Sequence, residues 1–389
     1  MQRDYEIVER KPLLDSAGHL TTEGWARSLV LDYDRSAVKG GALRIKEWDY
    51  YLITCPNYAI ALTVDDNSYM SLDSISLLDF RGEKPVEQTT SPMGVMTLGR
   101  RKFPSSSLEG DVKGSGSGYS ISFENPGPDS EGKTVRKLSF FMKKFASAEK
   151  FGLDSGTVGI EGEIRLTQYP GDTIVMATPF SEKKTAFYYN QKINCQEAAG
   201  LVKLVSADSS ELARYEFTPE DSFGCLDWGR GVWTYKNTWY WGSASGMVSG
   251  KRFGFNIGYG FGDNPATENI IFYDGVGHKL SRVSFNIPTK NKTFVTRGGC
   301  CGTEAGLRVE TADSEEMFME KWTFTSDDGR FEMEFIPVLD RAANTDFVIL
   351  GSNQHQVFGH YTGRAVLDDG TVLQIEDLLG FAEKVSNKW

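Results

Sequence analysis

The sequence is short of the residues that usually carry metal or redox chemistry. It contains five cysteines and four histidines among 389 residues, and no two cysteines form a Cys-x-x-Cys pair. No Cys or His stands at the spacing of a structural zinc site, so we expect no bound metal. A low, odd number of cysteines is typical of reduced thiols in a cytoplasmic protein.

Long apolar runs and an excess of positive charge are also missing. The charged start of the chain lacks the apolar core of a signal peptide, and no stretch approaches the roughly 20 apolar residues that span a bilayer. The net charge is −11, without a local run of Lys and Arg. These features disfavour nucleic acid and anionic membranes as partners and predict a cytoplasmic protein without an integral membrane segment.

What the sequence does contain is the alternation of apolar and polar residues that is typical of β-strands. Residues 119–123, 159–166 and 251–257 alternate in this way, whereas helical periodicity is scarce. Asp-Asp-Gly turns at 327–329 and 368–370 each separate two alternating runs, as in β-hairpins. The pattern predicts an all-β chain built from barrels or sandwiches.

An internal repeat divides the chain into two similar halves. A Trp-led strand, a second strand and an apolar strand ending in Asp occur twice, at an offset of 191 to 195 residues, close to half the chain. The two sets are 48–53, 59–64 and 75–79, and then 239–243, 252–257 and 270–274. Duplication predicts an N-terminal barrel over residues 1–210 and a C-terminal barrel over residues 211–389.

One segment, Asp227 to Gly246, is the leading candidate for a functional site because four tryptophans fall within fourteen residues. A carboxyl group among rings is desolvated, which raises its pKa and lets it donate a proton near neutrality. Ring faces can also stabilise a developing cation. Asp227 is therefore the first candidate acid. The candidate ligand-binding residues of the segment are Trp228, Arg230, Trp233, Tyr235, Lys236, Trp239 and Trp241.

Two alternatives to acid catalysis apply to the same segment. Aromatic rings stack on sugar faces, so the ligand could be a carbohydrate and the reaction could use paired carboxylates. A structural role is also open, in which Asp227 pairs with Arg230 or Lys236 and the tryptophans fill one end of a barrel.

Further candidates lie downstream of the aromatic segment. Asp263 and Glu268 are candidate catalytic carboxylates, and the alternative is a loop that hydrogen-bonds its own backbone. His278 lies in a predicted turn that could reach the mouth of a pocket and is a candidate ligand-binding residue; its alternative is a solvated turn residue.

Over most of its length the chain resembles a bacterial and fungal protein family called domain of unknown function 2804. The stretches that carry the resemblance are 45–51, 187–195 and 226–246. They add Trp48, Asp49 and Tyr189 to the candidate ligand-binding residues.

More distantly, the chain is similar to the double-lipocalin superfamily of hydroxyneurosporene synthase (a carotenoid hydratase), tocopherol cyclase and lipocalin-like Diels–Alderases. Tyr188-Tyr189, Asp227-Trp228-Gly229 and Trp239-Tyr240-Trp241-Gly242 stand in the order of that superfamily's motifs. The histidine that follows the aspartate there is absent, because Trp228 comes directly after Asp227. Any mechanism that uses this histidine is therefore in doubt for this chain.

This resemblance implies two lipocalin-like (calycin) antiparallel β-barrels in tandem, with a ligand site between or inside them, and chemistry without redox cofactors or metals. The leading hypothesis is a lyase, hydratase, cyclase or isomerase that acts on a small hydrophobic ligand. Asp227 would be its proton donor or orienting carboxylate. The alternatives are a carbohydrate-active enzyme and a lipocalin-like binding protein without chemistry.

Overall fold

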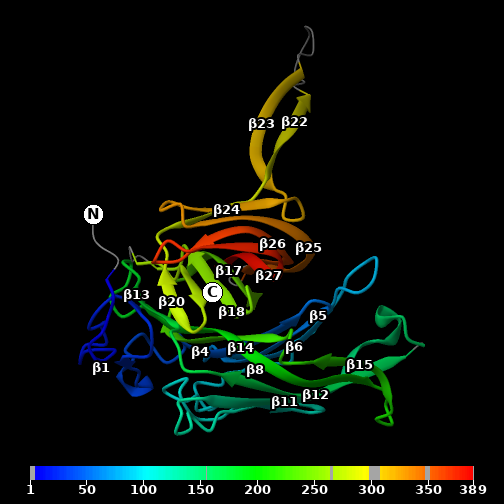
Figure 1. The fold of residues 1–389 in the computed structure, drawn as a ribbon, viewed down its shortest axis with the longest axis horizontal. Helices are drawn as coiled ribbons and strands as arrows, with labels where there is room; N and C mark the ends of the chain where they lie inside the picture. Colours follow the sequence, from blue (N-terminus) through cyan, green and yellow to red (C-terminus); the bar gives the residue numbers. More distant parts are fainter. Residues whose placement is uncertain (1–4, 155, 263–265, 298–306, 347–350, 389) are drawn as a thin grey trace.

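The structure is a computed structural model that describes residues 5–154, 156–262, 266–297, 307–346 and 351–388. Strands dominate it, and the only helical elements in these ranges are two 3-10 turns, η1 (Arg35–Ala37) and η2 (Ala148–Phe151). Two large antiparallel sheets curl strongly and face each other (Figure 1). The prediction of an all-β chain with two lipocalin-like barrels in tandem is confirmed, each sheet forming a half-barrel.

The first sheet has fourteen strands. They are β2 (Gly24–Ala26), β4 (Ile45–Cys55), β5 (Tyr58–Asp66), β6 (Met70–Asp79), β7 (Val86–Thr90), β8 (Met93–Val95), β9 (Val112–Gly116), β10 (Tyr119–Glu124), β11 (Thr134–Ser147), β12 (Thr157–Gln168), β13 (Ile174–Pro179), β14 (Phe187–Val205), β15 (Glu211–Phe217) and β16 (Phe223–Val232). The curl brings β7 to β11, where Thr90 Oγ1 donates a hydrogen bond to the Phe145 carbonyl at 2.7 Å.

The second sheet has nine strands. They are β17 (Lys236–Val248), β18 (Lys251–Tyr259), β19 (Ile270–Tyr273), β20 (Val276–Lys279), β21 (Val283–Asn286), β24 (Trp322–Ser326), β25 (Phe331–Asp346), β26 (Gly351–Val366) and β27 (Val372–Lys388). A parallel pair, β1 (Lys11–Pro12) and β3 (Leu31–Asp32), and a hairpin of β22 (Thr289–Arg297) and β23 (Leu307–Glu316) complete the fold. The hairpin projects away from the second sheet (Figure 1).

The two sheets share one strand order. The first runs β6-β5-β4-β16-β14-β12-β11, and the second runs β19-β18-β17-β27-β26-β25-β24. In each half the first three strands of this order form a meander, β4 to β6 in the first sheet and β17 to β19 in the second. The first strand of each meander pairs with the last strand of its half, β4 with β16 and β17 with β27. This common order agrees with the predicted internal repeat. The change of sheet lies between Val232 and Lys236, later than the boundary expected near residue 210, because β15 and β16 still belong to the first sheet.

The interior of the first half-barrel is filled, partly by an inserted chain segment. Buried Arg230 donates to the Pro104 carbonyl at 3.1 Å, and buried Arg136 donates to the Ser107 carbonyl at 3.0 Å. These charge-assisted bonds hold the segment inside the barrel. Buried apolar side chains from many of its strands pack together in the same half-barrel.

A separate apolar cluster joins the two sheets. It comprises Tyr50, Leu52, Ala59, Ala61, Leu78 and Cys225 from the first sheet, and Trp241, Phe358 and Phe381 from the second. Alternation along β16 explains the arrangement: Cys225 and Asp227 point toward the second sheet, whereas Trp228 and Arg230 point into the first half-barrel.

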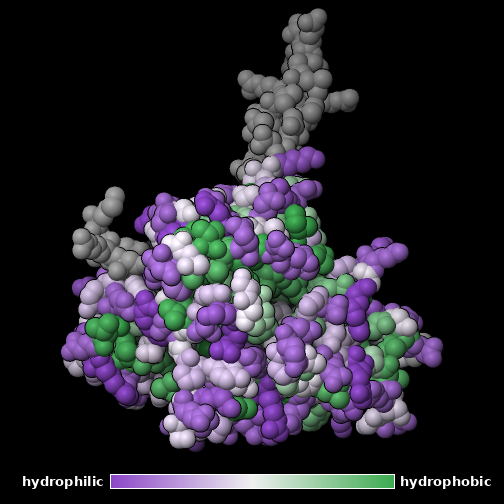
Figure 2. All heavy atoms as spheres, in the orientation of Figure 1, coloured by the Kyte–Doolittle hydropathy of each residue, from purple (hydrophilic) through white to green (hydrophobic). Residues whose placement is uncertain are grey.

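The outer surface seen in Figure 2 is mainly hydrophilic, with apolar residues scattered over it. Within the described residues, no helix has the length and the apolar character needed to cross a membrane.

Candidate functional site

A buried ion pair lies between the two sheets. Lys192 on β14 and Asp227 on β16 are direct neighbours across the strand pair, and Lys192 Nζ lies 2.8 Å from Asp227 Oδ2. The Lys192 side chain is only 3% exposed, and its Nζ lies 3.6 Å from the centroid of the Trp241 ring. Burial alone would lower the pKa of Lys192, but the negative charges of Asp227 and Glu268 outweigh it and raise this pKa.

A second buried carboxyl, Glu383, lies on β27 directly opposite Trp241. Trp239 Nε1 donates to Glu383 Oε1 at 2.9 Å, and Gln356 Nε2 donates to Oε2 at 3.0 Å. Burial raises the pKa of Glu383 to about 7, although the bond from Trp239 and the charge of Lys192 act in the opposite direction.

A third carboxyl, Glu268, lies in the segment that precedes β19. Its backbone is anchored because Asn256 Nδ2 donates to the Glu268 carbonyl at 2.9 Å, while Asn256 Oδ1 accepts from Trp241 Nε1 at 2.7 Å. Glu268 Oε2 is inaccessible and has no hydrogen-bond partner within the described residues. Burial raises the pKa of Glu268; the charge of Lys192 opposes the shift and that of Asp227 adds to it.

A cavity of about 350 Å³ opens beside Glu268, which is part of its wall; Lys192, Asp227 and Glu383 are not among the described residues that line it. Its wall includes Met176 and Tyr188 from the first sheet, and Tyr259, Phe261 and Glu268 from the second half. The volume falls in the range of about 300–1,000 Å³ that is typical of small-molecule sites. The cavity is therefore the natural place for a ligand near Glu268.

Five aromatic rings form a cluster beside the cavity. The Phe261 ring lies at the centre, with its centroid 4.6 Å from Tyr188, 4.8 Å from Trp233 and 5.2 Å from Trp239. Trp48 stacks on Tyr188 at 6.1 Å and meets Trp233 edge-on at 5.2 Å. The negative ring faces of such a cluster can stabilise positive charge.

Local backbone geometry explains how Phe261 reaches this position. Gly260 and Gly262 on either side of it have φ values of +91° and +82°, in the left-handed region that favours glycine. A Cβ atom at Gly262 would overlap the Thr178 side chain on β13. Both glycines therefore let the loop lie close to its neighbours and aim the Phe261 ring into the cluster.

The structure brings together part of the site that the sequence predicts. Asp227, Glu268 and four of the predicted aromatic residues meet in the region between the sheets. These four are Trp48, Trp233, Trp239 and Trp241. Asp227 pairs with Lys192, not with Arg230 or Lys236 as the structural alternative supposed.

Four predicted ligand-binding residues, Asp49, Tyr189, Trp228 and Arg230, point into the first half-barrel, away from Lys192 and Asp227. Arg230 forms an ion pair with Asp49 at 3.0 Å, and its guanidinium lies 4.2 Å from the Trp228 ring. The hydroxyl of Tyr189 donates to the Leu31 carbonyl at 2.7 Å. The alternation of the strands puts these side chains on the face opposite to Lys192 and Asp227.

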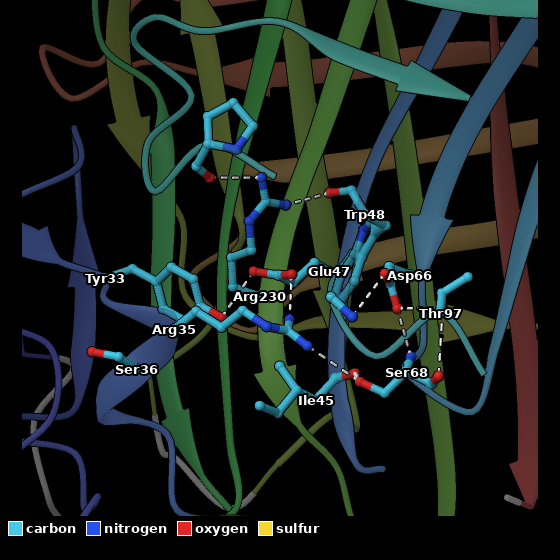
Figure 3. A network of polar contacts seen from close by, with 12 residues as sticks. Tyr33, Arg35, Ser36, Ile45, Glu47, Trp48, Asp66, Ser68, Thr97 and Arg230 are labelled. Atoms are coloured by element: carbon cyan, nitrogen blue, oxygen red, sulfur yellow. Dashed lines mark hydrogen bonds and ion pairs between the residues drawn. The ribbon is translucent and has the colours of Figure 1, made fainter. Parts of the chain in front are cut away.

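Figure 3 shows that Arg230 belongs to a structural network. Its guanidinium donates to the Trp48 and Pro104 carbonyls, and the neighbouring Glu47 carboxylate accepts from the Tyr33 hydroxyl at 3.0 Å and from Arg35. This network ties β4 and β16 to the N-terminal segment. A ligand-binding role for Arg230 is not apparent in this arrangement, since every contact that it makes is internal to the half-barrel.

The remaining predicted residues lie away from the cavity wall or outside the described part. Tyr235 and Lys236 are exposed in the link between the sheets. His278 Nδ1 lies 3.2 Å from Asp368 Oδ2, and this histidine is not among the described residues that line the cavity. Asp263 lies outside the described residues. No group of three or more His, Cys, Asp or Glu within the described ranges is arranged to hold a metal ion.

Sequence reasoning missed several residues of the site. Lys192 and Glu383 were not among its candidates, nor was Phe261. The alternation of Tyr188, Asn190 and Lys192 places all three on one face of β14, so a signal for Lys192 was present. Glu383 lies 156 residues after Asp227, at the equivalent place of the second half, and only the repeat could have indicated it.

Several solved structures are similar over nearly the whole chain. CghA crystallised with Sch210972 has a TM-score of 0.45 and 13% identity, covering 98% of this chain and 97% of that chain. A second CghA structure has a TM-score of 0.42 with the same identity and coverage. An AttH candidate from Nitrosomonas europaea has a TM-score of 0.43 and 10% identity, covering 91% of this chain and 96% of that chain.

Curated protein sequences provide no significant match to the chain. A family model does match, over residues 4–389. Since this range spans almost every residue, the chain belongs to the family described as domain of unknown function (DUF2804).

Proposed function

We propose that this protein is an acid–base enzyme of the lyase, hydratase, cyclase or isomerase type, which binds a small organic ligand in the cavity between the sheets. Glu268 is its proton donor. The observation that carries the proposal is a charge imbalance: the carboxyls of Asp227, Glu268 and Glu383 share the buried ammonium of Lys192, and the one further positive charge that acts on Glu383 among the described residues is that of Arg341.

This imbalance favours carboxyl groups that keep their protons. An isolated carboxylate in an apolar interior is costly, so a buried carboxyl without a counter-charge shifts its pKa upward. Lys192 makes its direct ion pair with Asp227. Glu268 and Glu383 are left with raised pKa values, and a carboxyl with a raised pKa is suited to donate a proton near neutrality.

The surroundings support a division of roles. Glu268 lines the cavity and can reach a ligand. The ion pair of Lys192 and Asp227 supplies a fixed electrostatic field that acts on Glu268. Rings such as Tyr188 and Phe261, on the cavity wall, can stabilise positive charge that develops when an alkene or a leaving group is protonated.

The experiment compares the wild type with Glu268→Gln, and uses Glu376→Gln, which changes an exposed glutamate of β27, as the matched control. Each protein is screened by thermal shift against isoprenoids, lipids and oligosaccharides, because binding to the folded state raises the melting temperature. Mixtures that give a shift are analysed by mass spectrometry for product, and in D₂O for deuterium taken up by the ligand.

We expect a ligand that shifts all three proteins and is converted by the wild type and Glu376→Gln only. A ligand that shifts all three but is never converted would identify a carrier without chemistry. Equal conversion by Glu268→Gln would remove Glu268 from the mechanism. Conversion of oligosaccharides alone would identify a carbohydrate-active enzyme.

A further inference from the structure

Arg282 is an exposed, positively charged residue on the wall of the cavity. It lies between β20 and β21, and it lines the same cavity as Glu268. Its backbone is fixed: the Arg282 N–H donates to Asp327 Oδ1 at 3.1 Å, and the Arg282 carbonyl accepts from the Asp327 N–H at 2.9 Å. The adjacent Ser281 N–H donates to Asp328 Oδ2 at 3.1 Å. The nearby carboxylates are thus engaged by backbone groups.

The guanidinium of Arg282, in contrast, makes no hydrogen bond or ion pair with any described residue. Neighbouring arginines of this half are paired. Arg330 Nη2 lies 2.6 Å from Asp368 Oδ1, and Arg252 Nη1 lies 3.1 Å from Glu197 Oε1. A cation whose backbone is anchored and whose head group has no partner among the described residues is available to an incoming anion.

The other charged residue among the described residues of the cavity wall is Glu268. Burial raises the pKa of the Glu268 carboxyl, and Arg282 is the positively charged residue of this wall. The rest of the wall includes the rings of Tyr188, Tyr259 and Phe261. The cavity therefore combines a positive group at one place with an aromatic wall and a proton donor at another.

We propose that the ligand is a small organic anion, with an apolar or cyclic body and a carboxylate or phosphate group that Arg282 binds. The body lies against the aromatic wall, and the end remote from the anionic group faces Glu268. The placement of that end rests on the proposed function, whereas the binding of an anion by Arg282 does not.

Isothermal titration calorimetry with three matched probes tests the proposal: phenylacetate, phenylacetamide and phenyl phosphate. We expect the anions to bind the wild type at least about tenfold more tightly than the amide, because a charge-assisted bidentate pair is lost with the amide. The better of the two anions shows whether a carboxylate or a phosphate is preferred. In Arg282→Gln, anion binding falls at least about tenfold and amide binding stays unchanged.

Arg364→Gln is the control variant, because this arginine is exposed and pairs with Glu332. It should bind like the wild type, and melting temperatures check that all variants are folded. The proposal is overturned if no anion binds, if the amide binds as tightly as the anions, or if Arg282→Gln retains anion binding. Glu268→Gln should still bind the anion. Anion binding as expected, together with equal conversion by Glu268→Gln in the ligand screen, would contradict the proposed function alone.

Discussion

Asp227 and Glu383 occupy equivalent positions in the two halves of the molecule. Asp227 on β16 lies opposite Tyr50, the third residue of the Trp-led run on β4, and Glu383 on β27 lies opposite Trp241, the third residue of the corresponding run on β17. Each carboxyl is buried and points into the region between the sheets. The duplicated fold thus presents two acids at one interface.

Their partners make the two acids different. Asp227 faces the ammonium group of Lys192 on the next strand, whereas the residue at the same place beside Glu383 is the neutral Gln356. A cation stabilises a carboxylate, and amide and indole donors stabilise it less. One half of the repeat therefore supplies an ion pair and the other supplies a carboxyl that titrates near neutrality.

Breaking the ion pair should destabilise the protein strongly. Asp227→Asn leaves the Lys192 ammonium buried without its direct counter-charge, and we expect a loss of about 3–5 kcal/mol in unfolding free energy. Adding Lys192→Met to Asp227→Asn removes the buried ammonium that has lost its counter-charge. The double variant should therefore lose less unfolding free energy than the sum of the two single losses. Urea denaturation of the four proteins measures the coupling, and purely additive losses would show that the pair does not interact.

The raised pKa of Glu383 makes stability depend on pH. An unfolded glutamate titrates near its ordinary value of 4.5, and folded Glu383 titrates at about 7. Between pH 4.5 and pH 7 the carboxyl of Glu383 is protonated in the folded state but ionised in the unfolded state. The contribution of this proton to the unfolding free energy is therefore complete below pH 4.5 and is lost as the pH rises through 7. We expect Glu383 to account for roughly 3 kcal/mol of this loss. The slope of unfolding free energy with pH should be smaller in Glu383→Gln; equal slopes would contradict the assignment.

The hydrogen bond from Trp239 should hold the pKa of Glu383 below the value that burial alone would give. Trp239→Phe removes this donor but keeps an aromatic ring in the cluster. We expect the pKa of Glu383 to rise further, because a bond that stabilises the carboxylate is lost. NMR of ¹³C-labelled glutamate carboxyls measures the titration. An unchanged or lower value in the variant would show that the bond is not made in solution.

Close packing at Gly229 fixes the place of Trp48. A Cβ atom at Gly229 on β16 would overlap the Trp48 indole ring. Gly229→Ala should therefore displace the ring from its stack on Tyr188 and cost about 1–3 kcal/mol in unfolding free energy. Gly82→Ala is the control, because the nearest atom to its added Cβ lies at 3.4 Å. Equal stability of the two variants in urea denaturation would contradict the packing described here.

The sequence allowed the strands and the repeat to be predicted because both depend on local patterns. Alternation identified segments such as β10 and β18, and the Trp-led runs identified β4 and β17. No change of composition marks the point at which the chain passes to the second sheet, because β16 ends the first sheet inside the aromatic segment.

The site could be predicted only in part because its geometry depends on which face of each strand is turned to the other sheet. Asp227 and Trp228 are adjacent in sequence but point to opposite sides of β16, so one joins the site and the other the core of the half-barrel. Lys192 and Glu383 come from distant strands whose pairing follows from the closed topology. A single sequence does not reveal such long-range contacts.

The titration of Glu268 tests the central claim most directly. ¹³C NMR of labelled glutamate carboxyls, with the Glu268 signal assigned by its loss in Glu268→Gln, follows the protonation of this residue with pH. We expect Glu268 to titrate clearly above the ordinary glutamate pKa of 4.5, since burial near Asp227 disfavours its charged form. A midpoint at or below 4.5 would mean that Glu268 is an ordinary carboxylate, and its role as a proton donor in this cavity would be wrong.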